Sequence, residues 1–395
     1  MIYLDNSATT FPKPRVVINS VNNSFMKYGA NPGRGGHQLA IRSSQIMFDS
    51  RNTLMRFFNA PDENSIIFTG SCTTACNMVL KGLLKSGDHV VVSCLEHNAV
   101  MRPLQKLSEN GINYTVARVY PNDNDKTLDS FRKAINQDTR LIFCIYASNV
   151  WGIKLPIDRI TALAHLYGIP IAVDAAQAAG IVPIDLKESG IDFLCCAGHK
   201  GLYGPMGTGM LIFNTDIPLD TIIEGGTGSN SYSLEQPEIL PDRFESGTQN
   251  LPGIVGLKAS TEFIMRRGVN NIANSEMRLI QYLYDRFSKI KEVKLYTDRP
   301  ESEHYVPLLS FNIEGMDSET ISAMLDKYGI AVRAGLHCAP FAHEFFGTID
   351  GGAVRVSPSM FTTRNDMDYL VNAILKIIHN LRNCLLYTSP SPRDA

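Results

Sequence analysis

From about residue 65 to residue 215, short apolar runs alternate along the chain with stretches of helical periodicity. This alternation is typical of an α/β fold, in which helices connect the strands of one sheet. Runs such as Leu141–Ile145 are apolar at every position, which indicates strands buried on both faces, as in a parallel sheet. The predicted strands are Ser65–Thr69, His89–Cys94, Arg140–Tyr146, Ile169–Val173, Phe193–Cys196 and Met210–Phe213.

Beyond residue 250 the pattern changes to long helical periodicity, followed by shorter strand and helix signals. Helices are predicted from Gly253 to about Arg267 and from Asn274 to Lys291. We therefore expect a large domain over residues 15–263 and a smaller C-terminal domain over residues 264–384. Residues 1–14 are expected to be part of the smaller domain.

The composition is that of an ordinary globular protein, with 44% hydrophobic and 19% charged residues. The 37 basic and 39 acidic residues give no indication of a nucleic-acid or membrane-surface partner. No secretory signal or membrane-spanning run is recognisable, so we expect a cytoplasmic protein. The eight cysteines are predicted to be reduced thiols, and their spacing indicates no metal site. Residues 385–395 match no fold pattern and are predicted to be a disordered tail or a sequence scar.

Polar residues follow the predicted strands at the point where each strand ends. The carboxyl ends of parallel strands share one edge of the sheet, which is where open α/β proteins bind ligands. Because loops are often polar, one such residue would carry little weight, but five consecutive strands that each deliver matched groups indicate a site. The segments are Gly70–Thr74, Glu96–Asn98, Ser148–Asn149, Asp174–Gln177 and Gly198–Lys200.

The groups at this edge match the needs of a pyridoxal-phosphate site. Lys200 lies between glycines, and a desolvated lysine there would bind the cofactor as a Schiff base. Asp174 ends an apolar strand, where a carboxylate needs a cationic partner such as a protonated pyridine nitrogen. His97 is placed to stack on the pyridine ring. Singly these residues are weak signals, since most lysines are solvated and many strand-end aspartates cap helices.

The cofactor's other polar groups also have candidate partners. Cys72 and Thr73 belong to the segment Ser71–Thr74, which lies ahead of Ala75–Met78 at a predicted helix start, and the backbone N–H groups there would hold the phosphate. Gln177 and Asn149 could reach the phenolic oxygen.

These residues carry a resemblance to a known family. The chain resembles the class V aminotransferase superfamily and, within it, the cysteine desulfurases and selenocysteine lyases. The resemblance implies a fold-type I transferase that depends on pyridoxal 5'-phosphate, with a mostly parallel seven-stranded sheet in the large domain and a smaller α+β C-terminal domain. It also implies a homodimer with shared active sites. The matching motifs are Tyr3–Thr10, Glu96–Asn98, Val173–Gln177, Gly198–Lys200, Tyr203–Pro205, Arg333–Ala339 and Ala353–Ser357.

The resemblance also implies roles for single residues. His97 would stack on the ring, Asp174 would pair with its nitrogen, and Gln177 would bond its phenolic oxygen. Lys200 would hold the cofactor covalently, and His199 would help to bind the phosphate.

Further residues would complete the site across the dimer. The segment Phe244–Thr248 matches one that sends a threonine, here Thr248, to the neighbour's phosphate. Arg34, in the loop Asn31–His37, would line the site. Arg355 would bind the substrate carboxylate through a bidentate pair, with Asn149 as a further substrate contact.

Cys338 acquires a role through the same resemblance. In this family a loop cysteine attacks the substrate sulfur, which releases alanine and leaves a persulfide on the enzyme. Such a thiol needs mobility and thiolate character. Gly335 would give the loop freedom, while Arg333 and His337 could favour the thiolate. An inert buried thiol is the alternative, but the loop around Cys338 is a poor core segment.

The leading hypothesis is therefore an L-cysteine desulfurase, with a sulfur-acceptor protein as a further partner. A selenocysteine lyase is a near alternative, and another class V aminotransferase or lyase is a more distant one. A catalytically silent binding or sulfur-relay protein is a hypothesis of another class. The chain departs from the family pattern at Thr74, Ala197 and Gly201. These departures affect the choice of substrate and acceptor and leave the cofactor chemistry intact.

Overall fold

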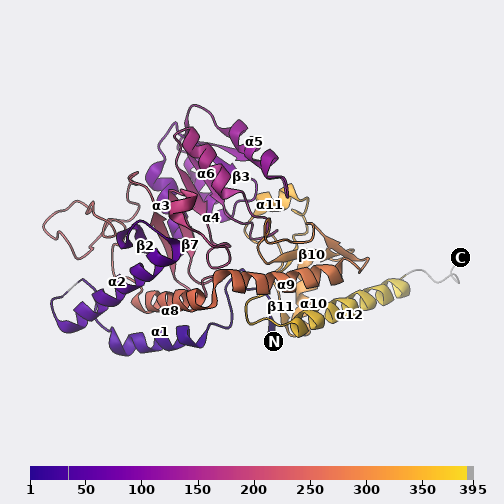
Figure 1. Cartoon of the computed structure of the whole chain (residues 1–395). Helices are drawn as coiled ribbons and strands as arrows, with labels where there is room; N and C mark the ends of the chain where they lie inside the picture. The colour runs from indigo at the N-terminus through magenta and orange to yellow at the C-terminus, as the bar shows by residue number, and fades with distance from the viewer. Residues whose placement is uncertain (34, 389–395) are drawn as a thin grey trace.

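The structure, a computed structural model, describes residues 1–33 and 35–388. Its larger part is built on a seven-stranded sheet with the order β2-β8-β7-β6-β5-β3-β4 (Figure 1). All neighbouring strands are parallel except at β8, which is antiparallel to both of its neighbours. The strands are β2 Ile66–Thr69, β3 His89–Ser93, β4 Asn113–Ala117, β5 Thr139–Ile145, β6 Ile171–Asp174, β7 Phe193–Ala197 and β8 Gly209–Phe213.

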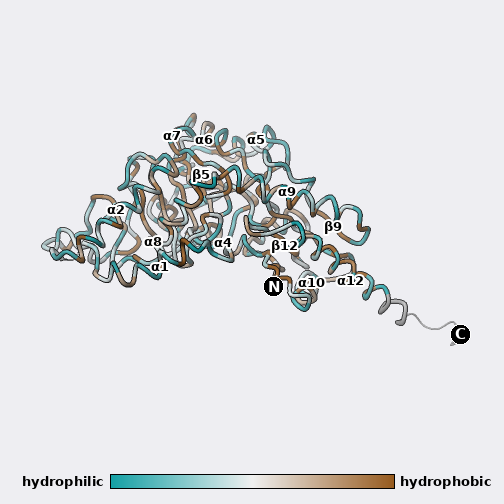
Figure 2. The backbone as a smooth tube through the Cα atoms, turned by 60° about the horizontal axis from the view of Figure 1, so that its bottom comes forward, coloured by the Kyte–Doolittle hydropathy of each residue, from teal (hydrophilic) through white to brown (hydrophobic). Residues whose placement is uncertain are grey.

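Helices cover both faces of this sheet, and its central strands are buried and largely apolar on both faces, as is usual for parallel sheets. Alternate residues of a strand point to opposite faces, so Ile142 joins one buried cluster while Leu141 and Phe143 join the other. Figure 2 shows the hydrophilic helix α5 at the periphery of the molecule. The helices of this part are α1 Arg15–Lys27, α2 Gln38–Phe58, α3 Cys72–Leu83, α4 Asn98–Ser108, α5 Asn124–Ala134, α6 Ile157–Leu166, α7 Leu186–Ser189 and α8 Leu251–Arg267.

A three-stranded antiparallel sheet, with the order β12-β10-β9, forms the second part of the structure. The N-terminal strand β1 (Ile2–Tyr3) pairs in parallel with β11 (Ile330–Ala331) beside it. The architecture confirms the expected fold class, whereas the domain boundaries at residues 15–263 and 264–384 stay predictions. The remaining elements are β9 Val293–Leu295, β10 Leu309–Ile313, β12 Val354–Val356, α9 Val269–Phe287, α10 Ser318–Lys327, α11 Pro340–Phe345 and α12 Arg364–Thr388.

Several predicted bounds differ by one to four residues from those of the structure, and three larger differences have a physical reason. Strand β4 was not predicted, because this edge strand is mostly polar or partly exposed and lacks a continuous apolar run. Helix α9 begins at Val269 and not at Asn274, since Gly268 with φ 83° ends α8 and lets the next helix start at once. Helix α12 extends to Thr388, so the predicted tail began too early at residue 385, where an apolar run continues the helix. The rest of that tail, 389–395, lies outside the described residues.

Within the described ranges, no helix combines the length and the apolar character needed to cross a membrane.

Candidate active site

A cavity of about 90 Å³ lies at the carboxyl ends of the parallel strands. Every predicted cofactor-binding residue except Thr248 contributes to its lining. Two of the three predicted catalytic residues, Lys200 and His97, face it as well. The residues concerned are Cys72, Thr73, His97, Asn149, Asp174, Gln177, His199 and Lys200. The shared edge of the sheet has therefore gathered side chains from five separate strand ends.

Lys200 lies in the turn that follows β7. Burial lowers the pKa of its amine, and the guanidinium groups of Arg355 and Arg333 lower it further, while Asp174 acts in the opposite direction. A lowered pKa leaves more of the amine unprotonated and thus available as a nucleophile or a base. The electrostatic setting is therefore the one expected for a reactive lysine.

Asp174 ends strand β6 with only 2% of its surface exposed. Its Oδ1 accepts hydrogen bonds from Cys72 Sγ at 3.3 Å and from the Ala176 amide at 2.9 Å. A hydrogen bond with Cys76, together with burial, holds the pKa of Cys72 well above the usual thiol range, so this thiol is a neutral donor. A buried carboxylate that accepts from these two neutral donors is suited to a cationic partner in the cavity.

Cys72, Cys76 and Asp174 bring their ligand atoms within 4.8 Å of one another. All three are buried, and both thiols have pKa values well above the usual range, so neither is a ready thiolate ligand. The expectation from the sequence that this protein has no metal site stays a prediction.

The start of helix α3 lines one end of the cavity, with free amide groups of the kind that suit an anion. Ser71 Oγ caps the helix by accepting from the Thr74 amide at 3.1 Å, while the first N–H groups of a helix have no partner within it. Gly209 allows β8 to approach this turn, because a Cβ there would lie 2.5 Å from the carbonyl carbon of Ser71. Nearby, His199 has a buried Nδ1 without a hydrogen-bond partner. The methyl group of Ala197 adds no polar contact to the cavity it lines.

Three further lining residues have fixed orientations. His97 caps helix α4, and its Nδ1 accepts from the Ala99 amide at 3.0 Å. Burial lowers the pKa of this ring to about 4, so it is neutral near pH 7. Gln177 donates from Nε2 to the Ser7 carbonyl at 3.0 Å, and Asn149 donates from Nδ2 to the His337 carbonyl at 2.8 Å. The buried Oδ1 of Asn149 has no partner.

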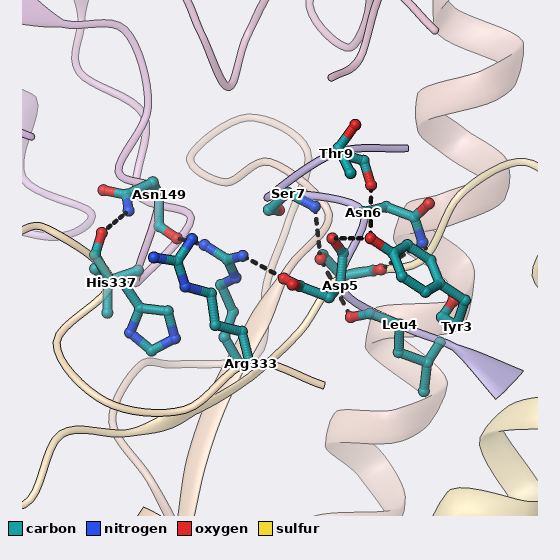
Figure 3. A network of polar contacts seen from close by, with 12 residues as sticks. Tyr3, Leu4, Asp5, Asn6, Ser7, Thr9, Asn149, Arg333 and His337 are labelled. Atoms are coloured by element: carbon teal, nitrogen blue, oxygen red, sulfur yellow. Dashed lines mark hydrogen bonds and ion pairs between the residues drawn. The ribbon is translucent and has the colours of Figure 1, made fainter. Parts of the chain in front are cut away.

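Arg355 lies behind Asn149 with only 1% of its surface exposed. Its Nη1 donates to the Asn149 carbonyl at 2.8 Å, and its Nη2 forms an ion pair with Asp5 Oδ1 at 2.7 Å. Figure 3 shows Asp5, Asn149, Arg333 and His337 converging on this place. Sequence analysis missed the role of Asp5, although it lies in a quoted motif. The role of Asp5 could have been inferred because a buried guanidinium such as that of Arg355 needs a carboxylate partner.

Cys338 is exposed on a loop next to this group. Both His337 and Cys338 have positive φ angles, 52° and 56°, which is an uncommon and strained backbone for residues with a side chain. The loop is tied to the start of α4, because the Asn98 amide donates to the Cys338 carbonyl at 2.8 Å. Arg333 Nη2 lies 3.8 Å from the Cys338 Sγ, and the role expected of Arg333 beside this thiol stays a prediction.

His337 cannot supply the second positive charge that was expected beside Cys338. Burial and the neighbouring Arg355 lower the pKa of His337 to about 2, so the ring is neutral. It stacks on His343 with an angle of 5° between the ring planes. The pairing orients the loop instead of adding charge to it.

Among the described residues, three of the predicted site residues do not line the cavity: Thr248, Cys338 and Arg355. Thr248 is exposed and accepts a hydrogen bond from Asn31 Nδ2 at 3.1 Å. Arg34 lies outside the described residues.

A second cavity, of about 30 Å³, also reaches Lys200 and was not foreseen. It is lined by Gln177, Tyr203 and Glu276, among others. Glu276 is buried in α9, and its Oε1 accepts from the Tyr203 hydroxyl at 2.9 Å. Its only sequence signal was an acid on the apolar face of a helix.

Comparisons with known proteins agree with the geometry. The family model described as aminotransferase class-V matches residues 2–370. A probable cysteine desulfurase of Methanothermobacter thermautotrophicus is 34% identical over 388 residues, which cover 95% of this chain and 94% of the relative. A probable cysteine desulfurase of Synechocystis is 29% identical and covers 95% of this chain and 90% of its own length.

Solved structures give the same answer. The apo structure of a cysteine desulfurase from Thermococcus onnurineus superposes with a TM-score of 0.89 at 28% identity, covering 96% of this chain and 95% of that one. A cysteine desulfurase from Escherichia coli has a TM-score of 0.85 at 27% identity, with 95% and 94% covered. These matches confirm the family resemblance and the fold-type I architecture. The chain belongs to the class-V aminotransferase family, whose members are enzymes that depend on pyridoxal phosphate.

Proposed function

We propose that this chain is a pyridoxal-phosphate-dependent cysteine desulfurase, which converts L-cysteine to L-alanine and leaves a persulfide on Cys338. One observation carries the proposal. The Lys200 amine and the Asp174 carboxylate face one cavity, and the loop with the exposed thiol of Cys338 is bonded to Asn149 at its wall and to Asn98, the neighbour of the lining residue His97. The names of the relatives, which are cysteine desulfurases, support L-cysteine as the substrate.

The lining residues fit the cofactor group by group. Lys200 would hold it covalently, Asp174 would pair with the ring nitrogen, and His97 would cover the ring face. The first amides of α3, at Cys72 and Thr73, would hold the phosphate together with the unpartnered Nδ1 of His199. Gln177 and Asn149 would reach the phenolic oxygen. Once bound, the cofactor would draw electron density from the Cα of the amino acid.

The chain's own residues then carry out the sulfur transfer. Arg355 would bind the substrate carboxylate, and the freed Lys200 amine would take the proton from Cα and later return one to the methyl carbon. The thiolate of Cys338 would attack the substrate sulfur. The carbon–sulfur bond of cysteine breaks as the sulfur–sulfur bond forms, so the products are alanine and one Cys338 persulfide.

We further infer a homodimer that shares its active sites. Support comes from Thr248, which is exposed and lies outside the cavity of its own chain, as expected for a residue that completes the partner's phosphate site. Arg34 is proposed to line the site from the neighbouring loop. A protein that accepts the sulfur from Cys338 is part of the same proposal, since the exposed thiol is accessible to it. Cytoplasmic location stays a prediction.

The test compares three purified variants with the unmodified enzyme. We expect the enzyme to be yellow and to release alanine from L-cysteine in the presence of a reductant. Lys200→Ala should lose both colour and activity, while Cys338→Ser should keep the colour and lose at least 99% of the alanine release, on the order of the loss of a catalytic nucleophile. Lys187→Ala, which removes an exposed lysine, serves as the control.

Two results would contradict the proposal. If Cys338→Ser keeps its alanine release, the chain is another lyase or aminotransferase of the class. If the unmodified protein is colourless after reconstitution with pyridoxal phosphate, the fold has lost its cofactor chemistry.

A further inference from the structure

The ion pair between Asp5 and Arg355 occupies the guanidinium that the proposed function assigns to the substrate carboxylate. The guanidinium group of Arg355 has three nitrogen atoms, and two of them already donate hydrogen bonds, Nη1 to the Asn149 carbonyl and Nη2 to Asp5. The third, Nε, is buried without a partner. Only 1% of the arginine side chain is exposed. In the described part of the chain, the carboxylate that forms an ion pair with it is that of Asp5.

Asp5 is held in this place by the backbone around it. It forms a bridge with Ser357, two residues beyond Arg355 in the chain. The amide of Ala8 and the hydroxyl of Tyr3 both donate to the Asp5 carbonyl, at 3.1 and 3.2 Å. Its side chain is 21% exposed, so solvent reaches the carboxylate while the guanidinium stays covered. The carboxylate is therefore fixed at the arginine and open on one side.

From this arrangement we infer that Asp5 is the resting counter-ion of Arg355, a stand-in for the substrate carboxylate that weakens the binding of substrate and product alike. This inference rests on the proposed function. A buried guanidinium without an anion would be costly, so the empty enzyme needs Asp5. An incoming carboxylate must share the guanidinium with Asp5, and the two anions repel each other. Asp5 is a positioning residue that makes carboxylate binding reversible and favours release of the alanine product.

The segment that contains Asp5 also reaches the cofactor lysine. The Ser7 carbonyl accepts from Gln177, and the Thr10 side chain donates to the carbonyls of His199 and Lys200, both at 3.2 Å. Figure 3 shows Asp5, Asn6, Ser7 and Thr9 along one segment on the side of the site where Arg333 lies. A carboxylate that shifts Asp5 therefore acts on a segment that contacts the lysine turn.

The test uses the holoenzyme with Asp5→Asn, which keeps a hydrogen-bond acceptor for Nη2 and removes the charge. We expect the KM for L-cysteine and the inhibition constant of L-alanine each to fall about tenfold, with no gain for cysteamine, which lacks the carboxylate. We also expect a lower Tm than that of the unmodified holoenzyme, and the difference should close at saturating L-alanine because the ligand supplies the missing anion. Asp125→Asn, which breaks a surface ion pair with Arg159, is the matched control and should change neither property.

The inference is overturned if KM rises or stays unchanged in Asp5→Asn, or if L-alanine does not close the difference in Tm. If Asp5→Asn does not fold, Asp5→Ser removes the same charge with a smaller polar group, and the same two outcomes are decisive. Failure of the proposed function is distinct, because the unmodified enzyme would then release no alanine from L-cysteine.

Discussion

Glu276 should make the stability of this protein depend strongly on pH. The carboxyl group lies in helix α9 with 2% of its surface exposed, and burial raises its pKa to about 8. The Tyr203 hydroxyl donates to its Oε1, and no cation pairs with it among the ion pairs of the described chain. The folded protein therefore holds a proton on Glu276 that the unfolded chain has lost above about pH 4.5.

The sign of the effect follows from this difference. A carboxyl group whose pKa is raised by folding stabilises the fold fully below its unfolded pKa and loses that contribution as the pH rises through the folded value. With values of 4.5 and about 8, the loss between pH 5 and pH 8 is about 3 kcal/mol. Burial also raises the pKa of Glu96 to about 8, so this second acid adds a loss of similar size and sign.

Glu276→Gln isolates the contribution of the first acid. The amide oxygen can still accept from Tyr203, while the group no longer titrates. We expect the variant to match the unmodified protein at pH 5 and to be more stable by about 3 kcal/mol at pH 8. Urea unfolding, followed through the fluorescence of Trp151, the single and buried tryptophan, measures the free energy of unfolding at both values.

Glu344→Gln, which changes an exposed acid, is the matched control and should leave the pH dependence unchanged. The reasoning is refuted if Glu276→Gln is as pH-dependent as the unmodified protein. It is also refuted if the variant is destabilised equally at pH 5 and pH 8, because Glu276 would then act as an ionised acceptor.

Three further changes test other contacts. Glu245→Gln removes the carboxylate that lies 2.5 Å from the buried Arg51 guanidinium. The free energy of unfolding, measured in urea, should fall by about 3 kcal/mol because the guanidinium loses its partner. A decrease below about 1 kcal/mol would contradict the buried ion pair. Arg333→Gln removes the guanidinium 3.8 Å from Cys338 Sγ and should slow alkylation by iodoacetamide several-fold at pH 7, whereas an unchanged rate would mean that this contact does not favour the thiolate. Cys72→Ala removes a hydrogen-bond donor to Asp174, whereas Cys72→Ser keeps one. During dialysis the cofactor should therefore dissociate several-fold faster from Cys72→Ala than from Cys72→Ser. Equal rates would exclude a role of this hydrogen bond in holding the cofactor.

The strand ends were the part of the site that could be predicted from sequence. A parallel sheet brings residues such as His97, Asp174 and Lys200 to one edge whatever the details of packing. Their apolar strands are recognisable because both faces are buried. Strand β4 lies at the edge of the sheet, so its residues do not need to be apolar, and the pattern is lost.

Contacts between distant segments could not be predicted in the same way. The pairing of Asp5 with Arg355 joins residues 350 apart, and the bond of Tyr203 to Glu276 joins residues 73 apart. Local periodicity has no information on such pairs. For His337, the nearby sequence indicated a cation beside Cys338, but the burial that makes the ring neutral comes from tertiary packing.

The persulfide on Cys338 is the step on which the proposed function depends most directly. The decisive measurement is mass spectrometry of the intact holoenzyme and of its Cys338 peptide after brief incubation with L-cysteine and without reductant. We expect one added sulfur atom on Cys338, formed in step with one alanine per active site and absent in Lys200→Ala. Release of alanine with no added sulfur on Cys338 would contradict the proposed mechanism at its central step.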